Sequence, residues 1–154
     1  LLKMGANIKL IEPNSLEVSC KNRLNSINFV TQPYPGFPTD AQALLMASCL
    51  KAEGTSVFEE NIFDCRYRHT DAFIKMGADI QVMGKVAVVK GVKKLHGATV
   101  EATDLRGGAA MAIAALSAEG TTEISRIAHI DRGYEKIEEA VRLLGGDMRR
   151  VVIN

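Results

Sequence analysis

The sequence lacks an excess of charge of either sign. It has 19 lysine and arginine residues against 18 aspartate and glutamate residues, a formal net charge of +1. Proteins that bind nucleic acid or an anionic membrane surface rely on a positive field, so this balance argues against both kinds of partner. No hydrophobic run approaches the length of a membrane span, and the opening residues Leu1-Leu2-Lys3 do not form a signal peptide.

Cysteine and histidine are also scarce, with three residues of each. The cysteines are odd in number and have no metal-like spacing, which favours a reducing compartment over a disulfide framework. No pair of histidines has metal-ligand spacing, so structural roles are expected for His69, His96 and His129. These absences predict a cytoplasmic protein without a metal or a cofactor.

The sequence does contain a repeated pattern. Helical patterns open at Thr39-Asp40 and at Thr103-Asp104, and each closes with Ala-Glu-Gly-Thr about 66 residues from its counterpart. Met4-Gly5-Ala6-Asn7-Ile8 is similarly echoed at residues 76–80, and more weakly at 144–148. The repeats predict a single domain over residues 1–154 that is built by duplication, with units of approximately 1–78 and 79–154. They also predict an aspartate at the same helical position in both units.

Each unit follows an approximate β-α-β-α-β-β order, which predicts an α/β fold. The helices expected at 40–52 and 107–118 are apolar nearly all round, a pattern typical of buried helices. Thr39 and Gln42 suggest a capping box for the first of these helices. Amphipathic helices are expected at 69–76 and 134–144, with strands at 8–11, 16–19, 27–30, 55–58, 79–82, 86–89, 99–102 and 122–125.

The chain is expected to begin inside a repeat. Leu1 to Ala6 has the character of the last turn of a helix with a glycine cap, whereas the equivalent segment at 73–78 is preceded by a full helical turn. There is also no initiator methionine. We therefore expect a truncated domain.

Three motifs resemble the UDP-N-acetylglucosamine 1-carboxyvinyltransferase family of enolpyruvyl transferases. They are PGFPTD at residues 35–40, ATDLR at 102–106 and HIDRGYE at 129–135, in the correct order through nearly the whole chain. The resemblance implies βαβαββ units of the inside-out α/β barrel type, of which about two are present. It also implies transfer of the enolpyruvyl group of phosphoenolpyruvate to the 3′-hydroxyl of UDP-N-acetylglucosamine, the first committed step of peptidoglycan synthesis.

The resemblance implies that a second domain is missing, together with its reactive loop cysteine and the N-terminal lysine and asparagine of the family. The isolated chain is therefore expected to be inactive, and its exposed interdomain surface is expected to favour self-association. Cys65 lies beside Arg66, but its place in the family pattern is wrong for the loop nucleophile. Cys49 is expected in the core.

Two aspartates are the candidate catalytic residues. Asp40 follows the expected N-cap, where the helix dipole stabilises an anion, and the family match makes it the base that contacts the sugar hydroxyl. Asp104 resembles an active-site aspartate that orients cations or handles protons. From the residues alone, Asp40 could equally support its helix, and Asp104 with Arg106 could form a solvated ion pair.

Substrate-binding residues are implied by the same resemblance. Arg106 and Arg132 match positions that bind phosphoenolpyruvate, and forked guanidinium groups suit its phosphate and carboxylate. Arg66 matches a position near the sugar nucleotide, and the backbone of Ile62 and Phe63 matches contacts to its uridine or diphosphate side. Without the resemblance, Arg66 would be assigned to an exposed charged turn.

Two other functions remain open at this stage. The chain could be a non-catalytic module that binds a UDP-sugar or takes part in an assembly. It could also belong to a shikimate-pathway enolpyruvyl transferase, which shares the fold.

Overall fold

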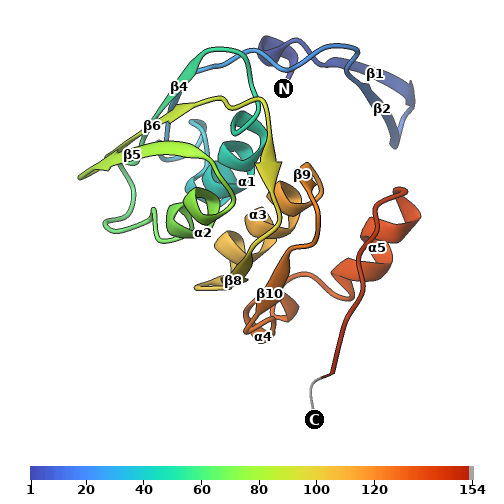
Figure 1. Cartoon of the computed structure of the whole chain (residues 1–154). Coiled ribbons are helices and arrows are strands. Elements are labelled where there is room, and N and C mark those ends of the chain that lie inside the picture. Colours follow the sequence, from blue (N-terminus) through green and yellow to red (C-terminus); the bar gives the residue numbers. More distant parts are fainter. Residues whose placement is uncertain (153–154) are drawn as a thin grey trace.

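Two apolar helices, α1 (Thr39–Cys49) and α3 (Leu105–Ala115), pack against each other at the centre of the molecule (Figure 1). The computed structural model describes residues 1–152. Both helices are largely buried, as their apolar sequences predict, and the many alanines of α3 are small enough for close approach. Asp40 and Arg106 project from this helix pair, and Asp104 caps the start of α3.

A mixed four-stranded sheet covers one side of the helix pair. Its strand order is β3 (Phe29–Val30), β4 (Thr55–Glu59), β6 (Val86–Lys90) and β5 (Asp79–Met83). β3 and β4 are parallel, whereas β6 runs antiparallel to both of its neighbours. With α1 and α2 (Thr70–Lys75), these strands follow the predicted β-α-β-α-β-β order, and the α/β class is confirmed.

The later part of the chain repeats the start of this arrangement with shorter strands. β8 (Thr99–Glu101) and β10 (Glu123–Ser125) pair in parallel on either side of α3, as β3 and β4 do around α1. A second parallel pair joins β7 (Leu95–His96) to β9 (Ala118–Glu119). The division into units at residue 78 stays a prediction.

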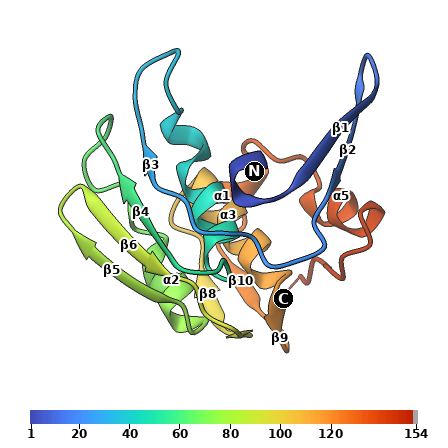
Figure 2. The same cartoon turned by 90° about the horizontal axis from the view of Figure 1, so that it is seen from above.

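The first and last elements extend away from the helix pair (Figure 2). A short 3-10 helix, η1 (Leu2–Met4), ends at Gly5 with φ of 92°, as its sequence predicts. The antiparallel hairpin of β1 (Asn7–Glu12) and β2 (Ser15–Ser19) follows. At the other end of the described residues, α4 (Ala128–Asp131) packs on α3, and α5 (Ile137–Leu143) is followed by irregular backbone up to residue 152.

The hydrophobic core lies between α1, α3, α2 and the four-stranded sheet. Its largest fully buried apolar side chains are Phe58, Phe73, Met4, Met46, Leu50, Met76, Leu95 and Met111. Cys49 is in this core as predicted, and burial raises the pKa of its thiol. Among residues 1–152, none of the helices has both the length and the apolar character needed to cross a bilayer.

The predicted start of α1 is wrong in its details. Pro38, not Thr39, is the N-cap residue, and the Thr39 hydroxyl donates to Glu60 instead of capping the helix. The Gln42 side chain is buried and takes no part in a capping box. Proline is compatible with this position because its ring fixes φ near the observed −73°, and the residue before the helix needs no N–H for a helical hydrogen bond.

The predicted equivalence of Asp40 and Asp104 is also wrong. Asp104 is the N-cap residue of α3, whereas Asp40 is the second residue of α1. Because α1 begins at Thr39 and α3 at Leu105, the helical position of Asp40 is occupied in the second unit by Arg106. Relative to the start of its helix, the second Thr-Asp pair therefore lies two residues earlier than the first.

The last predicted helix is shorter than its pattern suggests. HIDRGYE forms the separate short helix α4 and the turn after it, and α5 begins only at Ile137. None of the residues of α5 is fully buried, and Leu143 and Leu144 are about 90% exposed. The apolar stripe of this helix thus has little to pack against in the described part of the chain.

Candidate functional site

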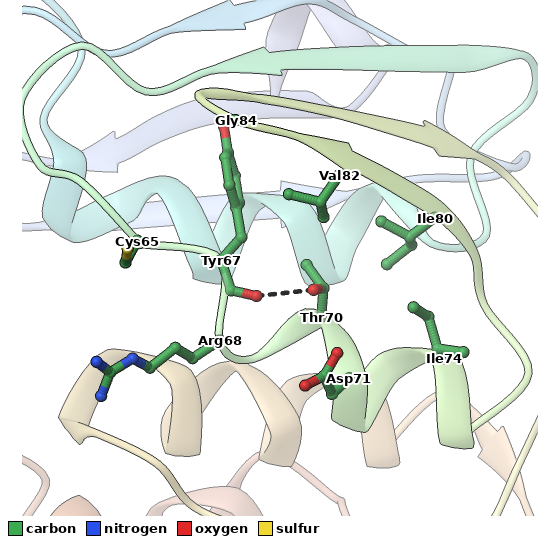
Figure 3. Close-up of a pocket in the computed structure, with 9 residues that line it drawn as sticks. All are labelled: Cys65, Tyr67, Arg68, Thr70, Asp71, Ile74, Ile80, Val82 and Gly84. Atoms are coloured by element: carbon green, nitrogen blue, oxygen red, sulfur yellow. Dashed lines mark hydrogen bonds between the residues drawn. The ribbon is translucent and has the colours of Figure 1, made fainter.

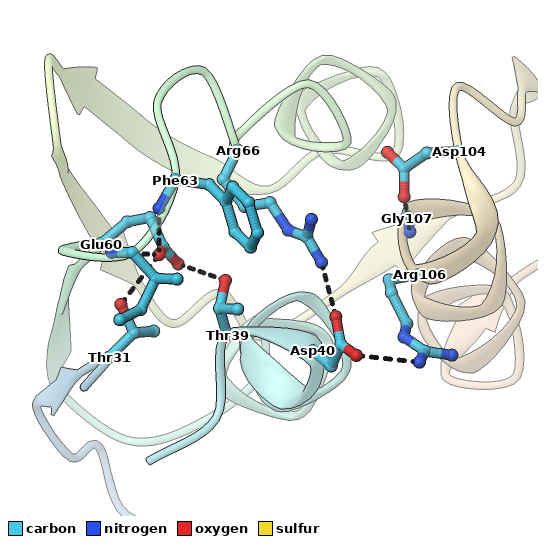
Figure 4. A network of polar contacts seen from close by, with 10 residues as sticks. Thr31, Thr39, Asp40, Glu60, Phe63, Arg66, Asp104, Arg106 and Gly107 are labelled. Carbon is cyan, nitrogen blue, oxygen red and sulfur yellow. Dashed lines mark hydrogen bonds and ion pairs between the residues drawn. The ribbon is translucent and has the colours of Figure 1, made fainter. Parts of the chain in front are cut away.

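Asp40 lies between two arginine side chains at the N-terminal end of the central helix pair (Figure 4). Arg66 donates to Asp40 Oδ1 at 2.9 Å and Arg106 donates to Oδ2 at 3.0 Å. Arg66 comes from the loop after β4, and Arg106 from the first turn of α3. The structure therefore brings together three residues that the sequence analysis singled out separately.

This cluster sets the electrostatics of the site. The hydrogen bond from Arg106, helped by the charges of Arg106 and Arg66, holds the pKa of Asp40 below its ordinary value of 3.8 despite some desolvation. The hydrogen bond to Asp40 in turn raises the pKa of Arg106, and the Tyr134 phenol adds to that effect. The Asp40 side chain is 59% exposed, so this ion pair can be reached by solutes.

Asp40 opens onto a hollow of about 320 Å³. One side of the hollow is formed by the loop before α1 and the other by the segment after β4. The lining residues are Gln32, Pro33, Pro38, Thr39, Asp40, Ile62 and Phe63. Three of the predicted site residues thus share one concave surface.

The Ile62–Phe63 segment is fixed by hydrogen bonds from its own backbone. The N–H groups of both residues donate to Glu60 Oε1, at 2.9 and 3.1 Å. The Phe63 ring also lies 5.2 Å from the Arg66 guanidinium, within cation–π range. Because both N–H groups are engaged, any backbone contact with a ligand here falls to the carbonyl oxygens.

Asp104 has a structural task at the start of α3. Its Oδ1 accepts the Gly107 N–H at 2.8 Å, and its carbonyl oxygen accepts the Gly108 N–H at 2.9 Å. These two N–H groups are therefore engaged by Asp104 and are not open to an anion. A Cβ on Gly108 would lie 2.6 Å from Ile130 Cγ1, so glycine there allows α3 to pack closely on α4.

Arg132 stands apart from the Asp40 cluster. It is exposed at the C-terminal end of α4, and within residues 1–152 it forms no ion pair. The neighbouring Asp131 is held by Arg150 through two hydrogen bonds of 2.9 and 2.7 Å. Its predicted role in binding phosphoenolpyruvate stays a prediction.

Two residues that touch the site were missed by the sequence analysis. Glu60 follows β4 and is 1% exposed, although a glutamate after a strand is usually on the surface. Tyr134 acts on Arg106 from the turn after α4. Only the HIDRGYE motif, which includes Tyr134, gave any signal for either residue.

A second hollow, of about 400 Å³, lies between α2 and the β5–β6 hairpin (Figure 3). None of the predicted site residues lines it. Cys65 does line it, and its backbone φ is 55°. The thiol thus lies at a different hollow from the one that Asp40 lines. That Cys65 is not the loop nucleophile stays a prediction.

Comparison with known proteins supports the resemblance. The family model for EPSP synthase (3-phosphoshikimate 1-carboxyvinyltransferase) matches residues 1–141. UDP-N-acetylglucosamine 1-carboxyvinyltransferase of Zymomonas mobilis is 50% identical over 98% of this chain, and that of Trichlorobacter lovleyi is 51% identical over 96%. The chain spans 35% and 36% of the length of these two relatives.

Solved enolpyruvyl transferases share the fold of this chain. The enolpyruvyl transferase NikO from Streptomyces tendae matches 99% of this chain, and 35% of its own, with a TM-score of 0.86 and 26% identity. EPSP synthase from Acinetobacter baumannii matches 97% of this chain, and 35% of its own, with a TM-score of 0.71. Its 17% identity shows the fold alone. By sequence model and by fold, the chain belongs to the EPSP synthase family of carboxyvinyl (enolpyruvyl) transferases.

Proposed function

We propose that this chain supplies part of the active site of a UDP-N-acetylglucosamine enolpyruvyl transferase. The reaction moves the enolpyruvyl group of phosphoenolpyruvate to the sugar 3′-hydroxyl and releases phosphate, which would be the first committed step of peptidoglycan synthesis in the cytoplasm. The observation that carries the proposal is Asp40, held between two guanidinium groups at the edge of a hollow. The names of the relatives at about 50% identity support the choice of sugar nucleotide.

Asp40 would act as the base. A sugar hydroxyl is a weak nucleophile at neutral pH, and a carboxylate that accepts its proton as the oxygen attacks the enol carbon lowers the barrier. The methylene carbon gains a proton in the same addition. Phosphate then leaves as its bond to the enol carbon breaks, and loss of a methyl proton restores the double bond. Asp104 would orient the cations or handle one of these protons.

The arginines would bind the anionic groups of the substrates. In the ligand-free cluster, Arg106 lowers the pKa of Asp40, which makes the carboxylate a weaker base. A phosphate or carboxylate that draws Arg106 away would remove the main cause of that shift. Substrate binding would thus raise the basicity of Asp40 when it is needed, with Arg106 and Arg132 holding phosphoenolpyruvate and Arg66 near the sugar nucleotide.

The test is phosphate release by the full-length enzyme, meaning this chain joined to the parts present in its longer relatives. Release is expected only with both phosphoenolpyruvate and UDP-N-acetylglucosamine present. Asp40→Asn should lower kcat by about 10²- to 10⁴-fold, the usual contribution of a general base. The isolated 154-residue chain should be inactive, and turnover by it at the rate of the full-length enzyme would contradict the need for a second domain.

A non-catalytic role is the alternative from another class. In that case the same hollow would bind a UDP-sugar or a protein partner without turnover. Titration calorimetry separates the cases, because the module hypothesis requires heat of binding with UDP-N-acetylglucosamine and no phosphate release in the full-length protein. Activity with shikimate 3-phosphate instead of the UDP-sugar would favour the shikimate-pathway enzyme.

A further inference from the structure

One buried carboxylate connects all the segments that line the hollow beside Asp40. The Glu60 side chain is 1% exposed and receives four hydrogen bonds (Figure 4). Its Oε1 accepts from the Thr31 hydroxyl at 2.9 Å and from the N–H groups of Ile62 and Phe63 at 2.9 and 3.1 Å. Its Oε2 accepts from the Thr39 hydroxyl at 2.9 Å.

The donors come from three separate places in the chain. Thr31 and Thr39 are the two ends of the proline-rich loop that forms one side of the hollow. Ile62 and Phe63 form the opposite side. Glu60 therefore fixes both sides of the hollow relative to each other, and it holds the helix residue immediately before Asp40.

The chemistry of the Glu60 carboxylate suits the joining of these segments better than a simple packing role. An ionised carboxylate only accepts hydrogen bonds, and here it meets four donors. Among the described residues, no arginine, lysine or histidine forms an ion pair with it. A buried carboxylate without a cation is costly unless hydrogen bonds compensate for the lost water, so the loop geometry and the carboxylate depend on each other.

We propose that Glu60 is a positioning residue for the sugar-nucleotide side of the active site. It shapes the hollow, keeps the N–H groups of Ile62 and Phe63 engaged so that only their carbonyl oxygens are left for a ligand, and sets the position of Asp40 through Thr39. This proposal rests on the proposed function. Glu60 contacts no substrate in this scheme and acts only through the segments that it joins.

The test uses the full-length enzyme and separates binding of the two substrates. Glu60→Ala should raise the Kd for UDP-N-acetylglucosamine at least about tenfold, a difference well resolved by calorimetry. It should also lower kcat, because Asp40 is misplaced, while the KM for phosphoenolpyruvate changes less than about twofold. Glu60→Gln should keep most of the affinity, since its amide oxygen can accept from the backbone and its NH₂ can donate to Thr39.

A matched control comes from the far end of β4, the strand that Glu60 follows. Ser56 is also buried and accepts the Ile27 N–H at 3.1 Å, far along β4 from the hollow. Ser56→Ala should lower the Tm without changing either substrate constant. If Glu60→Ala lowers the Tm but leaves the Kd for the UDP-sugar equal to that of Ser56→Ala, Glu60 is a folding residue only and the proposal is wrong.

A milder pair of variants keeps the proposal testable if Glu60→Ala does not fold. Thr39→Val removes one donor to Glu60, whereas Thr39→Ser retains it. Thr39→Val should raise the Kd for the UDP-sugar, whereas Thr39→Ser should leave it close to the value of the unmodified enzyme. Equal Kd values for the two variants would overturn the proposal. If the unmodified enzyme binds no UDP-N-acetylglucosamine but does turn over shikimate 3-phosphate, the proposed function fails, and the role assigned to Glu60 fails with it.

Discussion

At the scale of single residues, the site depends on one carboxylate, that of Asp40, which two arginine side chains share. Asp40 accepts from two arginines at 2.9 and 3.0 Å, yet its side chain is 59% exposed. Exposed ion pairs contribute about 0–1 kcal/mol to stability, so the cluster matters more for chemistry than for folding. Because the pKa of Asp40 is lowered, its small stabilising effect is present above pH 3.8 and is lost as the pH falls through its folded-state pKa.

The first prediction concerns the pKa of Asp40. Arg106→Gln removes the hydrogen bond that is the main cause of the lowered value, so the pKa should rise toward 3.8. Carboxyl titration by NMR measures the change directly. Arg126→Gln is the control, because Arg126 pairs with Glu101 at 2.7 Å and not with Asp40. An unchanged Asp40 titration in the Arg106 variant would show that the guanidinium does not control it.

The second prediction concerns His69, which is 1% exposed and packs edge-on against Phe73. Burial lowers the pKa of His69 from 6.5 to about 4. Between these values the unfolded chain binds a proton that the folded chain does not. Stability should therefore be full above pH 6.5 and fall by about 2 kcal/mol between pH 7 and pH 5.

Urea unfolding across that pH range tests the effect. His69→Phe should flatten the pH dependence, since it keeps an aromatic ring and removes the titrating group. His96→Gln should not, because His96 is exposed. If all three proteins lose stability equally between pH 7 and pH 5, another group is responsible.

At the scale of elements, the longer strands and the two central helices could be predicted from the sequence, but their ends could not. Long, almost uniformly apolar segments indicated α1 and α3 correctly as buried helices. The two-residue strands β7 and β9 and the four-residue helix α4 are too short to show a period. The capping residues were misplaced because Thr-Asp fits an N-cap in either register, and only the tertiary bond from Thr39 to Glu60 decides between them.

The same limit applies to the site. The resemblance pointed to Asp40, Arg66 and Arg106, and these side chains do meet. Glu60 could not be found in this way, because its burial results from donors that lie 29 and 21 residues earlier in the chain. A sequence window around Glu60 contains no sign of those partners.

The third prediction separates the two roles of Asp104, which are helix cap and catalytic group. Asp104→Ala removes the acceptor for the Gly107 N–H and should cost about 1 kcal/mol of stability. Asp104→Asn keeps an oxygen in that position and should cost less. Chemical unfolding measures both variants.

Activity of the full-length enzyme then decides the catalytic question. If Asp104 handles a proton or orients cations, the Asn variant should be stable but slow. A stable Asn variant with normal kcat would leave Asp104 as a cap alone. An Ala variant as stable as the unmodified protein would instead contradict the capping role.

At the scale of the whole molecule, the β1–β2 hairpin has one apolar face that no other element within residues 1–152 covers. The register pairs Leu10 with Leu16 and Ile8 with Val18, so these side chains share a face. Leu10, Leu16 and Val18 are 69%, 66% and 56% exposed. A two-stranded hairpin is marginally stable by itself, and exposed apolar patches of this kind promote association.

The fourth prediction is therefore that the 154-residue chain self-associates through this face. Leu10→Lys combined with Leu16→Glu should abolish association, because it replaces an apolar cross-strand pair by an ion pair that still supports the hairpin. The control swaps the charges on the opposite face, Lys9→Glu with Glu17→Lys, and should associate like the unmodified chain. Sedimentation velocity over a range of concentrations measures all three. A strictly monomeric unmodified chain, or equal association of both double variants, would show that the hairpin face does not drive assembly.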